Sequence, residues 1–295
     1  MIKADLHIHS KYSPDGEYEV ADIVDMVAGA KVGVFTLSDH NSVSAICEAV
    51  VLAEERNIGF IPGIEIDCVF EGTDMHLLGY GINWESEDFI SLEQDIRTKT
   101  LDSLSEMLYN LARLGIEVEA DEVMRLADGR LPSGELIAEA LLSNPEYDYP
   151  ELEPYRQGGA RADMPYLNFY FDYFAQGRPA YVAMDFMSFK AAVELVRDNG
   201  GTPVVAHPGL NFRGNERIVE KMLSAGAHGL EVFNNYHNDA QMDYFAGVVM
   251  NERVLMTCGS DFHGKTKPSI SIGQYGNLAE YADYLNDSVM KLCSR

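Results

Sequence analysis

Five of the chain's eight histidines lie in four short motifs, each at or just beyond the end of an apolar run. The motifs are Asp5-Leu6-His7-Ile8-His9, Ser38-Asp39-His40-Asn41, Ala206-His207-Pro208-Gly209 and Gly259-Ser260-Asp261-Phe262-His263-Gly264. Glu65 has a similar place in the apolar segment 61–66. Imidazoles and carboxylates, without paired cysteines, are the ligands of zinc, manganese or iron at hydrolytic sites. Because parallel barrels carry their active sites at strand ends, the repeated arrangement predicts a metal centre.

The spacing of these residues supports the prediction. His7 and His9, like Asp261 and His263, are separated by two, so on a strand end both side chains of a pair face the same way. A carboxylate in the apolar setting of Glu65 is unfavourable unless it is paired or bound to metal, and its two oxygens can bridge two ions. Taken singly, most of these residues could be structural; His76, for example, could be an ordinary core histidine. Together they favour a metal site.

Composition limits the classes of function. The chain has 295 residues, of which 46% are hydrophobic and 23% charged, as in a soluble globular protein of one large or two smaller domains. Its net charge of −25 disfavours nonspecific binding to long nucleic acids or anionic membranes, which need a basic surface. An anionic substrate must therefore be attracted by bound metal and a few local cations.

The lack of a recognisable targeting signal and the spacing of the cysteines predict a cytoplasmic protein. No apolar stretch approaches the roughly 20 residues that span a bilayer, and the first residues contain no signal-peptide core. The four cysteines are scattered and lack CxxC spacing, which favours free thiols in a reducing compartment.

Alternating strand and helix patterns predict an α/β fold. Strands are expected at 2–7, 32–37, 58–66, 75–81, 203–206, 229–233 and 254–257, and helices at 20–30, 42–56, 188–199, 216–225, 239–251 and near 278–292. Such alternation is typical of a parallel sheet with helical crossovers. Six or seven strand–helix units fit a distorted (β/α)7 barrel formed by residues 1–83 and 181–295.

Residues 84–180 interrupt this pattern and predict an inserted, mainly helical subdomain. Helices are expected at 85–114, 121–127 and 133–142, whereas 144–176 is rich in Tyr, Pro and Phe without a clear period. No histidine occurs between His76 and His207, so the insert should cover the site without building its metal centre. Most rings of its aromatic segment 166–174 are expected in the subdomain core, with one or two free to stack on a substrate base.

The motifs DLHIHS, SDHN, GIEI, a single His76, AHPG, GLEVFNNYH and GSDFHG, in that order, resemble the PHP (polymerase and histidinol phosphatase) superfamily. The resemblance covers about 1–83 and 178–275 and is strongest to stand-alone phosphoesterases that act on nucleotides and other small phosphate esters. It implies a distorted barrel of seven strands.

The resemblance also implies a ligand set. One metal ion would bind His7, His9, Glu65 and Asp261; a second would share Glu65 and bind His76 and His207; a third would bind Asp15, His40 and His263. Some members have histidine where this chain has Asp15. We therefore expect two or three divalent ions of Mn, Fe or Zn.

The insert departs from the family pattern. Related phosphatases often carry an Arg and a His in the segment that corresponds to 133–141, and this chain has neither. The segment 177–182 does resemble the family's return into the barrel, which makes Arg178 a candidate for binding phosphate. His237 is a candidate for contacting substrate or supporting a ligand.

The expected function is hydrolysis of a small phosphate ester, either a nucleotide-like phosphomonoester or a cyclic phosphodiester. Two ions sharing Glu65 would activate a water for attack on phosphorus, and His207, His237 or Asp261 would supply a proton. We assign catalytic roles to Glu65, His207 and Asp261. The alternatives are an exonuclease acting on short oligonucleotides, a metal-dependent amidohydrolase, or a silent metal-binding barrel. The exact ester, the native metals and the oligomeric state are left open.

Overall fold

Two β-sheets form the wall of a distorted barrel in the computed structural model, which describes residues 2–276 and 279–294. Among these residues, β1 (Ala4–Ile8), β2 (Val34–Leu37) and β3 (Gly59–Phe60) form one sheet in that order. The second sheet has the order β6 (Met187–Ser188), β4 (Gly63–Phe70), β5 (Thr73–Tyr80), β7 (Thr202–Val205), β8 (Gly229–Phe233) and β9 (Leu255–Cys258). The predicted α/β class is thereby confirmed.

The sheets join at two seams rather than in one continuous ladder, and both seams run through the histidine motifs. At the first, Ile8 bridges to Phe262, and the amide of Asp261 donates to the carbonyl of His7 at 2.8 Å. At the second, His40 bridges to Glu65. Closing the barrel therefore brings the predicted metal ligands together.

One strand runs against the expected direction. The alternation predicted a parallel sheet, but β5 is antiparallel to both β4 and β7. Only Glu71 and Gly72 separate β4 from β5, which is too short for the crossover of a dozen or more residues that a parallel pair needs. The hairpin places the first half of β5 at the edge where the parallel strands end, and His76 pairs there with Asp67.

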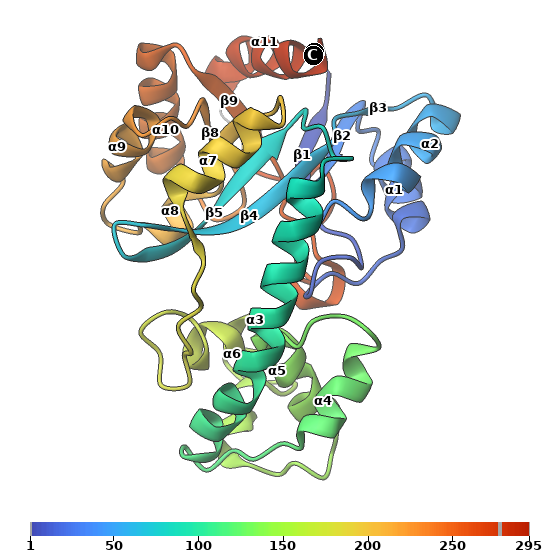
Figure 1. Cartoon of the computed structure of the whole chain (residues 1–295), viewed down its shortest axis with the longest axis vertical. Helices are drawn as coiled ribbons and strands as arrows, with labels where there is room; N and C mark the ends of the chain where they lie inside the picture. The colour runs from blue at the N-terminus through green and yellow to red at the C-terminus, as the bar shows by residue number, and fades with distance from the viewer. Residues whose placement is uncertain (1, 277–278, 295) are drawn as a thin grey trace.

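Helices cover the outside of the barrel (Figure 1). They are α1 (Val20–Gly29), α2 (Ile46–Arg56), α7 (Phe189–Asp198), α9 (Ile218–Ser224), α10 (Asp239–Glu252) and α11 (Ala282–Cys293), with the short α8 (Pro208–Asn211) beside β5. In α7, for example, Ser188 caps the first turn, and Phe189, Ala192, Val193 and Val196 form the buried stripe expected of an amphipathic helix. Leu278, where we expected the terminal helix to begin, lies outside the described residues.

A helical subdomain lies against the barrel and is connected to it by the long helix α3 (Glu87–Ala112), as Figure 1 shows. It also contains α4 (Ala120–Ala127), α5 (Gly134–Ser143), the 3-10 helix η1 (Pro150–Tyr155) and α6 (Pro165–Tyr173). Helix α6 was not predicted, because its nearly continuous aromatic run obscures the helical period. Phe89 and Ile96 of α3 belong to the barrel core, whereas Leu111 belongs to the subdomain core. We therefore propose that the boundary lies within α3 rather than at residue 84.

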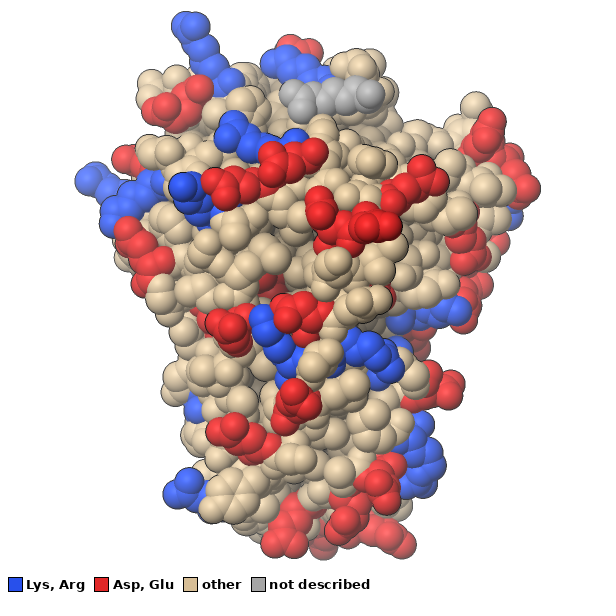
Figure 2. Space-filling view, in the orientation of Figure 1, with Lys and Arg blue, Asp and Glu red and all other residues tan. Residues whose placement is uncertain are grey.

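Acidic side chains are spread over both the barrel and the subdomain, with Lys and Arg among them, as Figure 2 shows for one face. The excess of carboxylates is therefore not confined to the predicted metal centre. None of the helices in the described ranges has the length and hydrophobicity to cross a bilayer.

Candidate metal centre

The nine predicted ligands converge at one end of the barrel. His7 and His9 come from the end of β1, His40 follows β2, Glu65 and His76 lie on β4 and β5, and His207, Asp261 and His263 follow β7 and β9. Asp15 joins them from the loop after β1. Four groups of potential ligands form here, each with ligand atoms within 4.8 Å of one another: His7, His9, Glu65 and Asp261; Glu65, His76 and His207; His9, Asp15, His40 and His263; and His40, Asp67 and His76.

The first three groups contain the residues that the family resemblance implies for three metal ions, with His9 added to the third. The fourth introduces Asp67, which sequence reasoning missed because β4 was expected to end at residue 66. Asp67 and Glu65 lie two apart on β4 and so point to the same face. We propose all ten side chains as ligands.

Glu65 lies at the centre of the cluster and is fully buried. Its Oε2 is 3.0 Å from His7 Nε2 and 3.2 Å from His9 Nε2. Its Oε1 is 3.0 Å from both His76 Nδ1 and His207 Nε2. Each carboxylate oxygen therefore faces a different group of histidines, which is the arrangement of a ligand shared by two ions.

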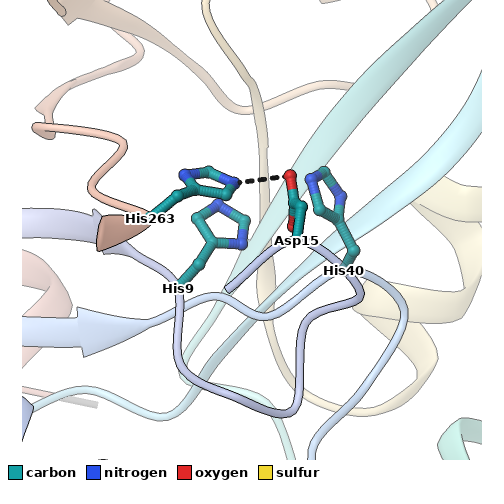
Figure 3. Close-up of side chains that lie close together, drawn as sticks. All are labelled: His9, Asp15, His40 and His263. Atoms are coloured by element: carbon teal, nitrogen blue, oxygen red, sulfur yellow. Dashed lines mark ion pairs between the residues drawn. The ribbon is translucent and has the colours of Figure 1, made fainter. Parts of the chain in front are cut away.

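The third group shows most directly that the residues fit a metal ion. Figure 3 shows His9, Asp15, His40 and His263 gathered together, with His263 Nε2 3.1 Å from Asp15 Oδ2. In the described part of the chain, eight buried side-chain N or O atoms have no hydrogen-bond partner, and four of them belong to these four residues. Buried polar atoms rarely stay unsatisfied. Ligand atoms that converge without hydrogen-bonding one another are suited to coordinating a cation.

Glu231 holds two of the ligand histidines, His7 and His207, in position, and the sequence analysis did not identify it. This buried residue of β8 accepts a hydrogen bond from the backbone amide of His207 at 2.8 Å, and its other oxygen lies 2.9 Å from His7 Nδ1. A carboxylate behind a ligand histidine fixes its tautomer and ring orientation. The available signal was a lone carboxylate in the apolar strand 229–233, the same signal that identified Glu65.

We expect Glu231→Gln to weaken metal binding about 10- to 100-fold, the usual effect of losing such a supporting carboxylate. Titrating metal-free protein with Mn²⁺ or Zn²⁺ measures this effect. Glu252→Gln, at the exposed end of α10, is the matched control and should bind as the wild type does. Unchanged affinity in the Glu231 variant would contradict the supporting role.

The carboxylates of Asp5 and Asp39 accept hydrogen bonds from neighbouring loops. Asp39 accepts hydrogen bonds from the backbone amide of Ser10 at 2.6 Å and from its hydroxyl at 2.7 Å. Asp5 accepts from the amides of Ser260 and Gly273 at 2.9 and 2.6 Å. These bonds favour a supporting role for both carboxylates.

One carboxylate oxygen of Asp261 faces the ligand histidines, and the other faces a buried lysine. Oδ1 lies 3.2 Å from His9 Nε2, whereas Oδ2 accepts from Tyr236 OH at 2.8 Å and from Lys267 Nζ at 2.5 Å. Sequence reasoning missed Lys267, which is buried. Its charge stabilises ionised Asp261 and fixes the direction of the carboxylate.

The charges of the cluster shift several pKa values strongly. Burial alone would raise the pKa of Glu65, but the neighbouring histidines, His7 above all, hold it well below its usual range. Burial would lower the pKa of His7 and His40, but Glu65 and the other nearby carboxylates together outweigh it. The pKa of His7 is therefore raised well above its usual value and that of His40 to about 10. Burial together with His263 lowers the pKa of His9 to about 4. In the metal-free protein the cluster therefore holds protons on some histidines while its carboxylates are ionised.

Metal binding should consequently depend on pH. A histidine must be neutral to coordinate, so each proton held by a histidine with a raised pKa, such as His7, must leave when an ion binds. Apparent affinity should rise with pH by about tenfold per pH unit for each proton released. Titrations with Mn²⁺ between pH 6 and 8 measure this slope. An affinity that does not change with pH would contradict the inference that some of the ligand histidines are protonated in the metal-free protein.

The backbone is strained at the same site. His207 has φ +23°, Asp261 +57° and Asn41 +54°, conformations that cost a non-glycine residue on the order of 1–3 kcal/mol. Gly259 allows β9 to approach β1 closely, since a Cβ there would lie 2.2 Å from that of His7. Strain of this kind persists where function requires it.

A cavity of about 480 Å³ lies over the cluster, within the size range of small-molecule sites. Glu65, His207 and Asp261 line its barrel side, and apolar residues of the subdomain line the opposite side. The latter include Leu131, Leu167, Tyr170, Phe171 and Phe174. Arg178 is exposed and also lines this cavity, where a phosphate group could reach it.

His237 does not line the cavity. Its Nδ1 lies 2.8 Å from the carbonyl oxygen of Val232, and its Nε2 accepts from the amide of Gly209 at 3.0 Å. Both ring nitrogens are occupied by backbone, so we reassign His237 from substrate contact to support of the turn that follows His207.

The comparisons with known proteins identify the family of the chain. The PHP domain model matches residues 5–157, just over half of the chain, and the chain belongs to this family. It is 28% identical to a 3',5'-nucleoside bisphosphate phosphatase of Chromobacterium violaceum, covering 94% of this chain and 93% of that protein. It is 25% identical to a 5'-3' exoribonuclease of Haemophilus influenzae (88% and 90% covered), and 27% identical to a phosphoribosyl 1,2-cyclic phosphate 1,2-diphosphodiesterase of Eggerthella lenta (88% and 94% covered).

Solved structures support the same fold. A protein from Chromobacterium violaceum, described as an amidohydrolase with bound sulfate and no metal, superposes with a TM-score of 0.78 at 26% identity, covering 97% of this chain and 96% of that one. A putative metal-dependent phosphoesterase from Bifidobacterium adolescentis also gives 0.78, at 22% identity, with 98% and 96% covered. The predictions of a PHP-type barrel and of a phosphoric ester hydrolase are confirmed at the level of the family.

Proposed function

We propose that the protein hydrolyses a small, nucleotide-like phosphate ester with the help of two or three divalent ions of Mn, Fe or Zn. The observation that carries the proposal is the position of Glu65, whose two oxygens face different ligand groups beneath a cavity. Bound ions would activate a water for attack on phosphorus and offset the charge of the phosphate oxygens. We further propose that the enzyme acts in the cytoplasm, in keeping with four cysteines that form no disulfide.

The chain's own residues prepare the site for this reaction. Glu231 and Asn211 fix the orientation of His7 and His207, and Lys267 keeps Asp261 ionised. We propose that Arg178 contributes a positive charge from its exposed position at the cavity and binds a phosphate oxygen. The apolar subdomain wall excludes water and accepts the nonpolar part of the ester.

The relatives favour nucleotide-like esters. The names of two of them specify a nucleoside bisphosphate and a cyclic phosphate of a ribose. Sulfate, bound in the similar Chromobacterium violaceum structure, is tetrahedral and doubly charged like phosphate. Cleavage of short oligonucleotides is the second candidate, because other relatives are named as 5'-3' exoribonucleases. The charge of −25 argues against long duplexes.

A panel of esters tests the proposal. Purified protein with added Mn²⁺ should hydrolyse at least one of nucleoside monophosphates, nucleoside bisphosphates, cyclic phosphates or dinucleotides, and chelation should abolish the hydrolysis. Free phosphate reports on the monoesters, and chromatography of the monoester product reports on the cyclic phosphates and dinucleotides. Amides assayed in parallel should stay intact. Hydrolysis of amides without hydrolysis of any phosphate ester would contradict the proposal and favour an amidohydrolase.

A further inference from the structure

The proton donor for the leaving group is not supplied by the residues that sequence reasoning proposed. Both ring nitrogens of His237 are bonded to backbone. His207 directs Nε2 at Glu65 and Nδ1 at Asn211. Asp261 directs Oδ1 at His9 and Oδ2 at Lys267. These three side chains are therefore engaged elsewhere, which leaves the other titratable groups of the cavity lining as candidates.

Glu135 lies on the subdomain wall of the same cavity as Glu65 and His207. It occupies the first turn of α5, which begins at Gly134 and is capped by Ser133, whose side chain accepts from the amide of Leu136. The turn is packed tightly against α6, because a Cβ at Gly134 would lie 2.8 Å from the ring of Phe174. The start of α5, which carries Glu135, is therefore held in place at the wall of the cavity.

The surroundings of Glu135 differ from those of the metal-ligand carboxylates in the cavity lining. Glu65, Asp261 and Asp15 each have a histidine or lysine within 4.0 Å, whereas in the described ranges no cation or histidine lies that close to Glu135, which is only 8% exposed. Burial is the main cause that raises the pKa of Glu135. A buried carboxyl group without a cationic partner tends to keep its proton.

We propose that Glu135 is the general acid that protonates the leaving oxygen of the ester. The inference rests on the proposed phosphoesterase function. As water attacks phosphorus, the bond from phosphorus to the leaving oxygen breaks, and the carboxyl proton of Glu135 moves to that oxygen to give an alcohol. The proton released by the attacking water returns through solvent to the Glu135 carboxylate, so the enzyme is regenerated and the products are alcohol and phosphate.

The leaving group provides the test. Glu135→Gln keeps the size of the side chain but cannot donate this proton. For a nucleoside phosphate, whose leaving alkoxide needs a proton, kcat should fall by about 10²–10⁴-fold, the usual contribution of general acid catalysis. For p-nitrophenyl phosphate, whose leaving phenolate is stable at neutral pH, the fall should be small. The wild-type kcat for the nucleoside phosphate should also decline as pH rises and Glu135 loses its proton, and the variant should lack this decline.

Glu139→Gln is the matched control, because Glu139 lies on the same helix but pairs with Lys265. It should affect both esters alike, if at all. Glu135→Asp, which retains a carboxyl group, should recover part of the lost activity, and elemental analysis should show the wild-type metal content in the Glu135→Gln variant. Parallel losses on both esters, no loss on either, or loss of metal would overturn the inference. A wild-type protein that releases phosphate from no ester would instead contradict the proposed function.

Discussion

Replacing Glu65 with glutamine is expected to lower kcat by on the order of 10³-fold at saturating metal, because several kcal/mol of stabilisation from two correctly placed ions would be lost together. The amide has one oxygen and no charge, so it cannot face both ligand groups as the carboxylate does. Steady-state phosphate release, measured across a metal titration, gives this value.

Asp15→Asn is the informative comparison. Asp15 belongs to one ligand group, whereas Glu65 belongs to two. Its loss should therefore reduce turnover less than the loss of Glu65, and elemental analysis should show one ion missing rather than two. Near-normal turnover of Glu65→Gln at saturating metal would refute the bridging assignment.

Truncation of Phe171 to alanine is expected to raise KM for the best nucleoside substrate by about 5- to 150-fold, corresponding to about 1–3 kcal/mol for a ring that stacks on a base. Phe171 is half-buried and lines the cavity, with its ring centroid 5.6 Å from that of Tyr170. Metal content and turnover of p-nitrophenyl phosphate should stay close to wild type, because the metal ligands are untouched.

Tyr109→Ala provides the control, since Tyr109 is 64% exposed on α3 and does not line the cavity. It should leave KM unchanged for both substrates. If Phe171→Ala impaired both esters equally, the ring would serve the packing of the subdomain, and specificity would have to reside in the barrel loops.

The ligand positions could be anticipated because their signals are local. A histidine or carboxylate at the end of an apolar run is visible in the sequence, and the barrel topology brings such ends together. The aromatic segment 166–174 was harder to interpret. Phe169 and Phe174 are in the subdomain core, as expected for most of its rings. None of its residues is fully exposed, and the rings available to a substrate, Tyr170 and Phe171, are partly buried in the cavity lining.

What could not be anticipated depends on contacts between distant segments. The reversed direction of β5 follows from a two-residue turn that composition alone does not reveal. Glu231 shows the same local signal as Glu65, but its contacts with His7 and His207, 224 and 24 residues away, appear only in the folded chain. The burial of Lys267 beside Asp261 likewise depends on the fold. Glu135 is a similar case, since its place on an exposed-looking helix start gives no sign of the cavity it faces.

The metal content of the purified protein tests the central claim most directly. Elemental analysis after mild purification without chelators should find two or three divalent ions per chain, drawn from Mn, Fe and Zn. Most of the proposed ligands are buried, and those of the third group converge without hydrogen-bonding one another, so retention of these ions is the expected result. Less than one ion per chain, in protein that nevertheless releases phosphate at its full rate, would contradict the account.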